Sequence, residues 1–131
     1  MKIVLDCNVL VAAGIKDGTC AACLREIVHN HQVFVSSPII EEYQAVIARP
    51  KFKKSYSTLV QLVEIVSDIS KWISPSPCSF QLPDSDDIIY LETALEAKAD
   101  ILITGNKKHF PNSTYDKVRI LNPKEFLDIC S

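Results

Sequence analysis

Short apolar runs recur along the chain, and polar or turn-forming residues bound each of them. Such continuous runs are typical of parallel strands, because both faces of these strands are buried in a sheet. On this pattern we predict strands at residues 2–5, 33–36, 71–73, 101–103 and 118–121.

Longer segments between these runs carry apolar residues every three or four positions, as on one face of a helix. The predicted helices span residues 19–30, 38–48, 55–69 and 86–98. Strands that alternate with helices are typical of the α/β class, in which helices cover both faces of a parallel sheet. We therefore predict an α/β fold.

Polar residues followed by proline mark two helix starts. Ser37 precedes Pro38, and Asn122 precedes Pro123, so in each pair an N-cap residue is followed by proline at the first helical position. Asn122 also has Glu125 three residues later, which is the spacing of a capping box. We predict that helices begin at these two points.

The chain has 131 residues, of which 47% are hydrophobic, and this is enough to fill one core. No repeat or linker divides it, so we predict a single domain over residues 1–131. No apolar run approaches the ~20 residues that a membrane-spanning helix needs, and Asp6 interrupts the apolar start that a signal peptide requires. We expect a cytoplasmic protein without a membrane segment.

The five cysteines are scattered and odd in number, which favours reduced thiols in a chain that can form a core without disulfides. Cys20 and Cys23 form a C-x-x-C pair inside the helix predicted at residues 19–30. No second pair of Cys or His residues has the spacing of a zinc site. We therefore interpret the C-x-x-C pair as helix packing.

The formal net charge of -2 gives no overall basic field of the kind that nucleic-acid-binding proteins carry. Any binding of nucleic acid must therefore be local. Basic clusters do occur, at Arg49, Lys51, Lys53 and Lys54 and at Lys107 and Lys108. Each cluster has two interpretations, a solvated surface or a site for phosphates.

Helical phase identifies Glu42 as a carboxylate that faces inwards. Ile39 lies three residues before it and Val46 four residues after it, so Glu42 falls on the apolar stripe of its helix. Glu41 falls on the more polar side. A carboxylate that faces inwards costs free energy unless it has a partner, so Glu42 needs one.

Three aspartates stand at the start of the helix predicted at residues 86–98. Asp84 fits an N-cap, and Asp86 complements the positive end of the helix dipole. Asp87 instead shares its side with Leu91, towards the sheet. Of the three, Asp87 is the candidate for a functional site.

Polar residues also follow two of the predicted strands directly. Asp6 and Asn8 come after the first strand, and Thr104 and Asn106 come after the strand that ends at residue 103. In open α/β sheets, ligands bind outside the carboxyl ends of the strands. We therefore expect these residues to lie at the functional edge of the sheet.

Asp6, Glu42 and Asp87, with Asn106 beside them, thus occupy strand ends or the inward faces of early helical turns. Carboxylates about 4 Å apart repel by ~4 kcal/mol per pair at an effective dielectric constant near ~20, so something must neutralise them. A cluster of oxygen ligands suits Mg²⁺ or Mn²⁺. Such ions activate water and stabilise an in-line phosphoryl displacement, so the cluster indicates phosphodiester chemistry.

These residues, within the motifs Asp6-x-Asn8, "EEY", "DDIIYLETALEAKAD" and "ITGN", occur in an order and spacing that resemble the PIN domain. The resemblance covers nearly the whole chain and is closest to the toxin components of bacterial toxin-antitoxin pairs. It implies a three-layer α/β/α fold with a parallel sheet of about five strands. It also implies a Mg²⁺- or Mn²⁺-dependent ribonuclease, a homodimer, and a small antitoxin that occupies the active site.

The resemblance makes Asp6, Glu42 and Asp87 metal ligands, with Asn8 as a polar residue that orients the cluster or the substrate. Asn106 departs from the family, which more often has a fourth aspartate at this position. An amide oxygen can reach a metal but brings no negative charge. We therefore expect one firmly bound ion, with a second recruited together with the RNA phosphate.

The resulting hypothesis is that a metal-bound water attacks a phosphodiester of single-stranded RNA. Thr104 and Asn106 would position that water or a scissile oxygen. The basic clusters would hold flanking phosphates, which gives salt-dependent affinity with little sequence selectivity. His109 has two interpretations, a general acid or a structural residue, and we favour the second for a lone histidine after a strand.

Two other functions fit part of the pattern. A phosphatase of the haloacid dehalogenase type also begins with a strand that ends in Asp and uses Mg²⁺. Such enzymes generally need Asp-x-Asp, and Asn8 cannot donate a proton as the second Asp does. A non-catalytic module would keep the fold and bind a protein or RNA, with a metal site impaired at Asn106.

Overall fold

The computed structural model describes residues 1–131 and contains a six-stranded sheet with the order β3-β2-β1-β4-β6-β5. The strands are β1 (Lys2–Leu5), β2 (Gln32–Val35), β3 (Lys71–Trp72), β4 (Ile101–Ile103), β5 (Thr114–Tyr115) and β6 (Val118–Leu121). All neighbouring strands are parallel except β5, which runs antiparallel to β6. The α/β fold is confirmed, and β5 is a strand that the sequence pattern did not predict, because Thr114–Tyr115 does not form a run of apolar residues.

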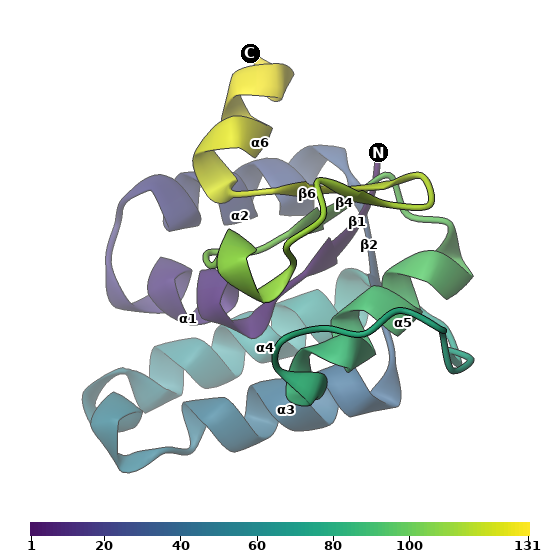
Figure 1. Ribbon diagram of the computed structural model, residues 1–131. Helices are drawn as coiled ribbons and strands as arrows, with labels where there is room; N and C mark the ends of the chain where they lie inside the picture. Colours follow the sequence, from purple (N-terminus) through teal and green to yellow (C-terminus); the bar gives the residue numbers. More distant parts are fainter.

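Helices cover both faces of this sheet, with α2 and α6 on one face and α3 and α5 on the other (Figure 1). The helices are α1 (Cys7–Ile15), α2 (Thr19–Asn30), α3 (Ser37–Ile47), α4 (Tyr56–Ile69), α5 (Ile88–Ala97) and α6 (Pro123–Cys130). Short 3-10 helices lie at η1 (Pro50–Ser55), η2 (Ser85–Asp87) and η3 (Lys107–His109). No single helix has both the length and the apolar character needed to cross a membrane.

One predicted helix start is confirmed and the other is shifted by a residue. Asn122 Oδ1 accepts a hydrogen bond from Glu125 N at 2.8 Å, and Glu125 Oε1 accepts one from Asn122 N at 2.9 Å, which completes the capping box. The N-cap of α3 is Ser36, and not Ser37 as predicted. The Ser36 hydroxyl caps no backbone group and lies 2.8 Å from the hydroxyl of Thr93, which links α3 to α5.

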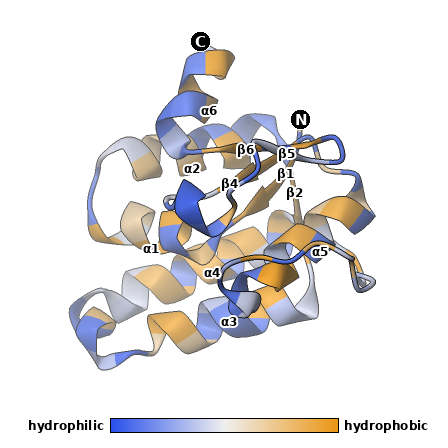
Figure 2. Ribbon diagram, in the orientation of Figure 1, coloured by the Kyte–Doolittle hydropathy of each residue, from blue (hydrophilic) through white to orange (hydrophobic).

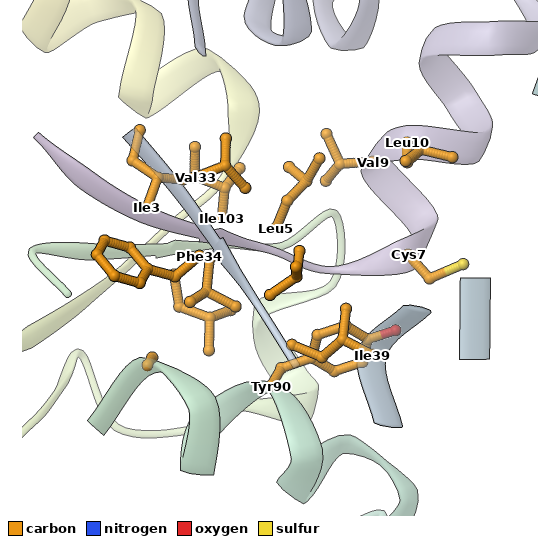
Figure 3. Packing of buried hydrophobic residues seen from close by; sticks show 14 of the residues in the cluster. Ile3, Leu5, Cys7, Val9, Leu10, Val33, Phe34, Ile39, Tyr90 and Ile103 are labelled. Atoms are coloured by element: carbon orange, nitrogen blue, oxygen red, sulfur yellow. The ribbon is translucent and has the colours of Figure 1, made fainter. Parts of the chain in front are cut away.

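A core of 34 buried residues lies between the layers, with β1 near its centre. Ile3 and Leu5 of β1 lie on the same side of the sheet as Val33 of β2, and Tyr90 of α5 lies on the other side (Figure 3). The central strands are largely hydrophobic, whereas polar residues gather on the outer surfaces of the helices (Figure 2). Because β1 is an inner strand, the residue that follows it, Asp6, lies near the middle of the edge that the carboxyl ends of the parallel strands form.

A candidate active site in an acidic cleft

A cleft of about 500 Å³ opens where β1 ends. We call it the acidic cleft, because three carboxylates, those of Asp6, Glu42 and Asp87, line it. Asn8, Tyr90, His109, Arg49 and Lys51 also line it, together with an apolar wall that includes Val46 and Phe52. The structure therefore brings together the three acidic residues that the sequence predicted for the site. Asp6 comes from the end of β1, Glu42 from α3 and Asp87 from the start of α5.

Asp6 is the most buried of the cleft carboxylates, with 5% of its surface exposed. Its backbone N–H donates to Ile103 O at 2.9 Å, which ties the carboxyl end of β1 to that of β4. Burial raises the pKa of Asp6 to about 6, the charge of Asp87 adds to this rise, and a hydrogen bond from Thr104 opposes it. A cation beside Asp6 would offset the cost of keeping this carboxylate charged.

Thr104 and Asn8 hold the Asp6 carboxylate in place. The Thr104 hydroxyl donates to Asp6 Oδ2 at 2.8 Å and accepts from Asn106 N at 3.1 Å. Asn8 Oδ1 accepts from Gly105 N at 2.9 Å, and Asn8 Nδ2 donates a longer bond of 3.4 Å to Asp6 Oδ2. A Cβ added to Gly105 would lie 3.1 Å from Asn8 Oδ1, so this close approach favours glycine. The turn after β4 thus orients Asp6 through its backbone and one hydroxyl.

Glu42 reaches the cleft from the second turn of α3. It is half-buried, whereas Glu41 is exposed, in agreement with the helical phase. The neighbouring Tyr43 is fully buried, and its hydroxyl donates to Leu5 O. This bond fixes α3 against the end of β1, so Glu42 is held on the same side of the sheet as Asp6.

Asp87 ends η2 and stands at the N-cap position of α5, but its side chain caps no backbone N–H. Only 14% of the side chain is exposed. His109 Nδ1 lies 2.9 Å from Asp87 Oδ2, which is the distance of an ion pair or a hydrogen bond. Burial raises the pKa of Asp87, and the charge of His109 opposes the rise. A buried carboxylate that is stabilised by a nearby positive charge is also suited to a metal cation.

The donor set of the cleft fits a hard divalent ion. Oxygens of Asp6, Glu42 and Asp87 do not all lie within 4.8 Å of one another, so they do not form the cluster with separations of about 4 Å considered above. Mg²⁺ is usually held by one or two carboxylates and keeps several water ligands. Asp6, Glu42 and Asp87 would therefore hold such an ion together with water ligands.

Asn106 does not line the acidic cleft. Its Oδ1 accepts from Lys108 N at 3.3 Å and so caps η3, while its backbone N–H supports Thr104. The side chain expected as the fourth corner of the site is turned into its own loop, because a short 3-10 helix begins at the next residue and needs an N-cap. Asn106 acts on the cleft only through the hydrogen bond that its backbone N–H donates to the Thr104 hydroxyl.

The first basic cluster divides into two parts. Arg49 and Lys51 line the acidic cleft, at the point where α3 gives way to η1. Lys53 and Lys54 are exposed and lie outside the cleft lining. Of the four, Arg49 and Lys51 are therefore the residues placed to meet a ligand in the cleft.

The second basic cluster is also divided. Lys107 Nζ lies 3.0 Å from Glu125 Oε1, so its charge is partly balanced by α6. Lys108 is exposed, and neither lysine lines the cleft. The residue of this segment that does line the cleft is His109, which the sequence analysis favoured as structural.

Sequence reasoning missed two further cleft residues. The Tyr90 hydroxyl is buried without a hydrogen-bond partner, and Lys16 follows α1 at the cleft rim. Tyr90 falls three residues after Asp87, on the same side of α5, and this spacing is the only signal that could have pointed to it. Lys16 carries no such signal, because its position depends on how α1 packs.

Comparisons with known proteins agree with this fold. The sequence profile of the PIN domain matches residues 2–108. The uncharacterized protein MJ1680 of Methanocaldococcus jannaschii is 25% identical to this chain over 98% of its length and 90% of that protein.

Two solved structures are similar in fold. One is a chain in the crystal structure of VapBC2 from Rickettsia felis bound to a DNA fragment from their promoter, with a TM-score of 0.65 and 20% identity over 93% of this chain and 98% of that chain. The other is a chain of VapBC-1 from nontypeable Haemophilus influenzae, with a TM-score of 0.60 and 16% identity over 95% and 99%. Because the family profile extends from β1 into η3, this chain belongs to the PIN domain family.

Proposed function

We propose that this protein is a Mg²⁺- or Mn²⁺-dependent endoribonuclease and the toxin component of a toxin-antitoxin pair. The observation that carries the proposal is the gathering of three carboxylates, those of Asp6, Glu42 and Asp87, in one cleft, with Asp6 almost fully buried. Membership of the PIN family supports it, because PIN domains are typically nucleases. The similarity to chains of two VapBC structures supports the toxin assignment.

The chain's own residues hold and orient the reacting groups. Asp6, Glu42 and Asp87 would hold the metal ion. The ion, when bound, supplies an activated water and neutralises charge that develops on the phosphate. Thr104 and Asn8 keep the Asp6 carboxylate in one orientation, so the ligand is preorganised before substrate binds.

His109 has a role that depends on its proton. As a cation it pairs with Asp87 Oδ2 and keeps that carboxylate charged, since the charge of His109 lowers the pKa of Asp87. The His109 side chain is 39% exposed and lines the acidic cleft. His109 would therefore be placed to donate a proton to a leaving oxygen.

The substrate is a single strand of RNA that enters past Arg49 and Lys51. These two side chains contact backbone phosphates on the rim, and the apolar wall at Val46 and Phe52 packs against an unpaired base. Lys53, Lys54 and Lys108 extend the basic surface outside the cleft. Contacts of this kind give affinity that depends on salt and only weakly on sequence.

The proposed antitoxin follows from the acidic cleft, and the proposed homodimer follows from the resemblance to PIN-domain toxins. A small antitoxin that covers the acidic cleft blocks RNA, and the toxin forms a homodimer in the cytoplasm. In this proposal the antitoxin competes with RNA for Arg49 and Lys51, so binding of the two is mutually exclusive.

Cleavage of a mixed RNA pool tests the proposal. The protein should cleave RNA with Mg²⁺ or Mn²⁺ and should stop when a chelator is added. Asp87→Asn should lose at least about 100-fold in rate, since it removes a charged metal ligand, whereas the exposed neighbour Asp86→Asn should stay close to wild type. Undiminished cleavage with chelator, or activity only on phosphomonoesters, would overturn the proposal.

A further inference from the structure

A second group of potential metal ligands lies away from the acidic cleft. Glu26 belongs to α2, His31 follows that helix, and Cys130 ends α6. One ligand atom from each lies within 4.8 Å of the other two. None of the three lines the acidic cleft. We propose that Glu26, His31 and Cys130 bind a zinc ion that joins α6 to α2, which pack side by side (Figure 1).

Two of the three separations between ligand atoms are near those of a tetrahedral zinc site, and the third is within 4.8 Å. His31 Nε2 lies 2.8 Å from Glu26 Oε2 and 3.8 Å from Cys130 Sγ. Zinc bonds of about 2.0 to 2.3 Å at tetrahedral angles separate neighbouring ligand atoms by roughly 3.4 to 3.6 Å. The ion therefore requires the Glu26 carboxylate to retreat by about half an ångström and the thiol to approach by less.

The chemistry of the donors selects the metal. One thiolate, one imidazole and one carboxylate form a mixed soft and borderline set, which favours Zn²⁺ over Mg²⁺ or Mn²⁺. The three protein ligands leave a fourth position for water. This set therefore differs from the all-oxygen acidic cleft, and the two sites should not compete for the same ion.

The surroundings support a shielded site. The His31 side chain is 10% exposed and that of Glu26 is 28% exposed. The ring of Phe126, in α6, meets the His31 ring edge to face at 5.1 Å and fixes its orientation. Zinc binds the thiolate form of cysteine, so binding must displace the thiol proton of Cys130 and zinc affinity should fall with falling pH.

Contacts without any metal account for part of this arrangement, because His31 Nε2 pairs with Glu26 and the amino group of Met1 donates to His31 Nδ1 at 3.1 Å. They do not account for Cys130, whose sulfur lies against Nε2. A zinc ion uses all three side chains at once. It also couples the last helix to the body of the fold, since binding to the folded state alone stabilises that state.

Cobalt substitution tests the site directly, because Co²⁺ bound to a thiolate in a tetrahedral site gives sulfur-to-metal charge-transfer absorption and intense visible bands. The full-length protein, with excess Mg²⁺ to occupy the acidic cleft, should show these bands up to one Co²⁺ per chain and lose them when Zn²⁺ is added. Cys130→Ser should abolish the charge-transfer absorption, and His31→Gln should weaken binding at least tenfold. Cys78→Ser, a half-buried cysteine outside the cluster, should behave as wild type.

A thermal melt provides the second readout. Zinc in excess should raise the melting temperature of the wild type and Cys78→Ser by several degrees and that of Cys130→Ser by much less, with unchanged circular dichroism showing that each variant is folded. Absence of charge-transfer absorption in the wild type would overturn the proposal. So would equal absorption in folded Cys130→Ser.

Discussion

The hydroxyl of Thr104 donates a 2.8 Å hydrogen bond to Oδ2 of Asp6, a residue 98 positions earlier in the chain. This bond joins the carboxyl ends of β4 and β1 and opposes the rise in the pKa of Asp6. Thr104→Val keeps the side-chain shape and removes the donor. We expect a further rise in that pKa, weaker Mn²⁺ binding by calorimetry, and a loss of about 1 to 3 kcal/mol in the free energy of unfolding. Thr104→Ser should retain the bond, and equal losses in both variants would contradict this role.

Gly105 tests the contact between the turn and Asn8. A Cβ at Gly105 would lie 3.1 Å from Asn8 Oδ1, whereas a Cβ at Gly18 meets nothing closer than 3.9 Å. Gly105→Ala should therefore displace the Asn8 amide and lower RNA cleavage several-fold, with a stability change of about 1 kcal/mol or less. Gly18→Ala is the matched control and should leave the cleavage rate unchanged. If the two variants cleave RNA equally well, Asn8 does not position Asp6.

The buried charge of Asp6 gives a pH-dependent stability. Its folded pKa of about 6 lies above the ordinary value of 3.8, so its favourable contribution is complete below pH 3.8 and is lost as the pH rises through 6. In metal-free buffer with chelator, Asp6→Asn should therefore be more stable than the wild type at pH 7.5, by about 2 to 3 kcal/mol. Denaturant unfolding should show this advantage shrinking as the pH falls from 6 towards 4. A variant that is less stable than the wild type at every pH would contradict the assigned burial cost.

The four residues of the basic cluster near η1 should contribute unequally to RNA affinity. Arg49 and Lys51 line the acidic cleft, whereas Lys53 and Lys54 do not. The double reversal Arg49→Glu/Lys51→Glu should weaken RNA binding by at least about tenfold and lower the slope of log affinity against log salt by ~2, because each phosphate contact adds about one. The matched reversal Lys53→Glu/Lys54→Glu should have a smaller effect. Equal effects would mean that RNA follows the outer surface and not the cleft.

Local patterns in the sequence predicted much of the fold. The strands at residues 101–103 and 118–121 and the helix at 19–30 have the predicted bounds, since each carries an unbroken apolar or periodic signal. The helical phase of Glu42 and Asp87 also pointed to the cleft, because phase depends only on neighbours in the chain. The start of helix α5 was harder to predict, because the chain first forms the 3-10 helix η2. Asp84 caps η2, since its Oδ1 accepts a hydrogen bond from Asp86 N at 2.9 Å.

The missed features depend on contacts between distant segments. Ser36 occupies the N-cap position of α3, but its hydroxyl contacts Thr93 of α5, which no local rule identifies. His109 reaches Asp87 only because η3 turns back over the start of α5. The Cys130 thiol meets His31 across 99 positions, so the search for a zinc motif by spacing could not find it. Side-chain partners of this kind require the tertiary fold.

A calorimetric titration with Mn²⁺ tests the central claim most directly, because it asks whether the cleft carboxylates hold a metal. The background should be Cys130→Ser, which removes the thiolate of the second site. We predict one firmly bound ion in this background and with Asp86→Asn added, and at least a tenfold loss of affinity with Asp87→Asn added. Binding of Mn²⁺ to the Asp87→Asn protein with undiminished affinity would contradict the account.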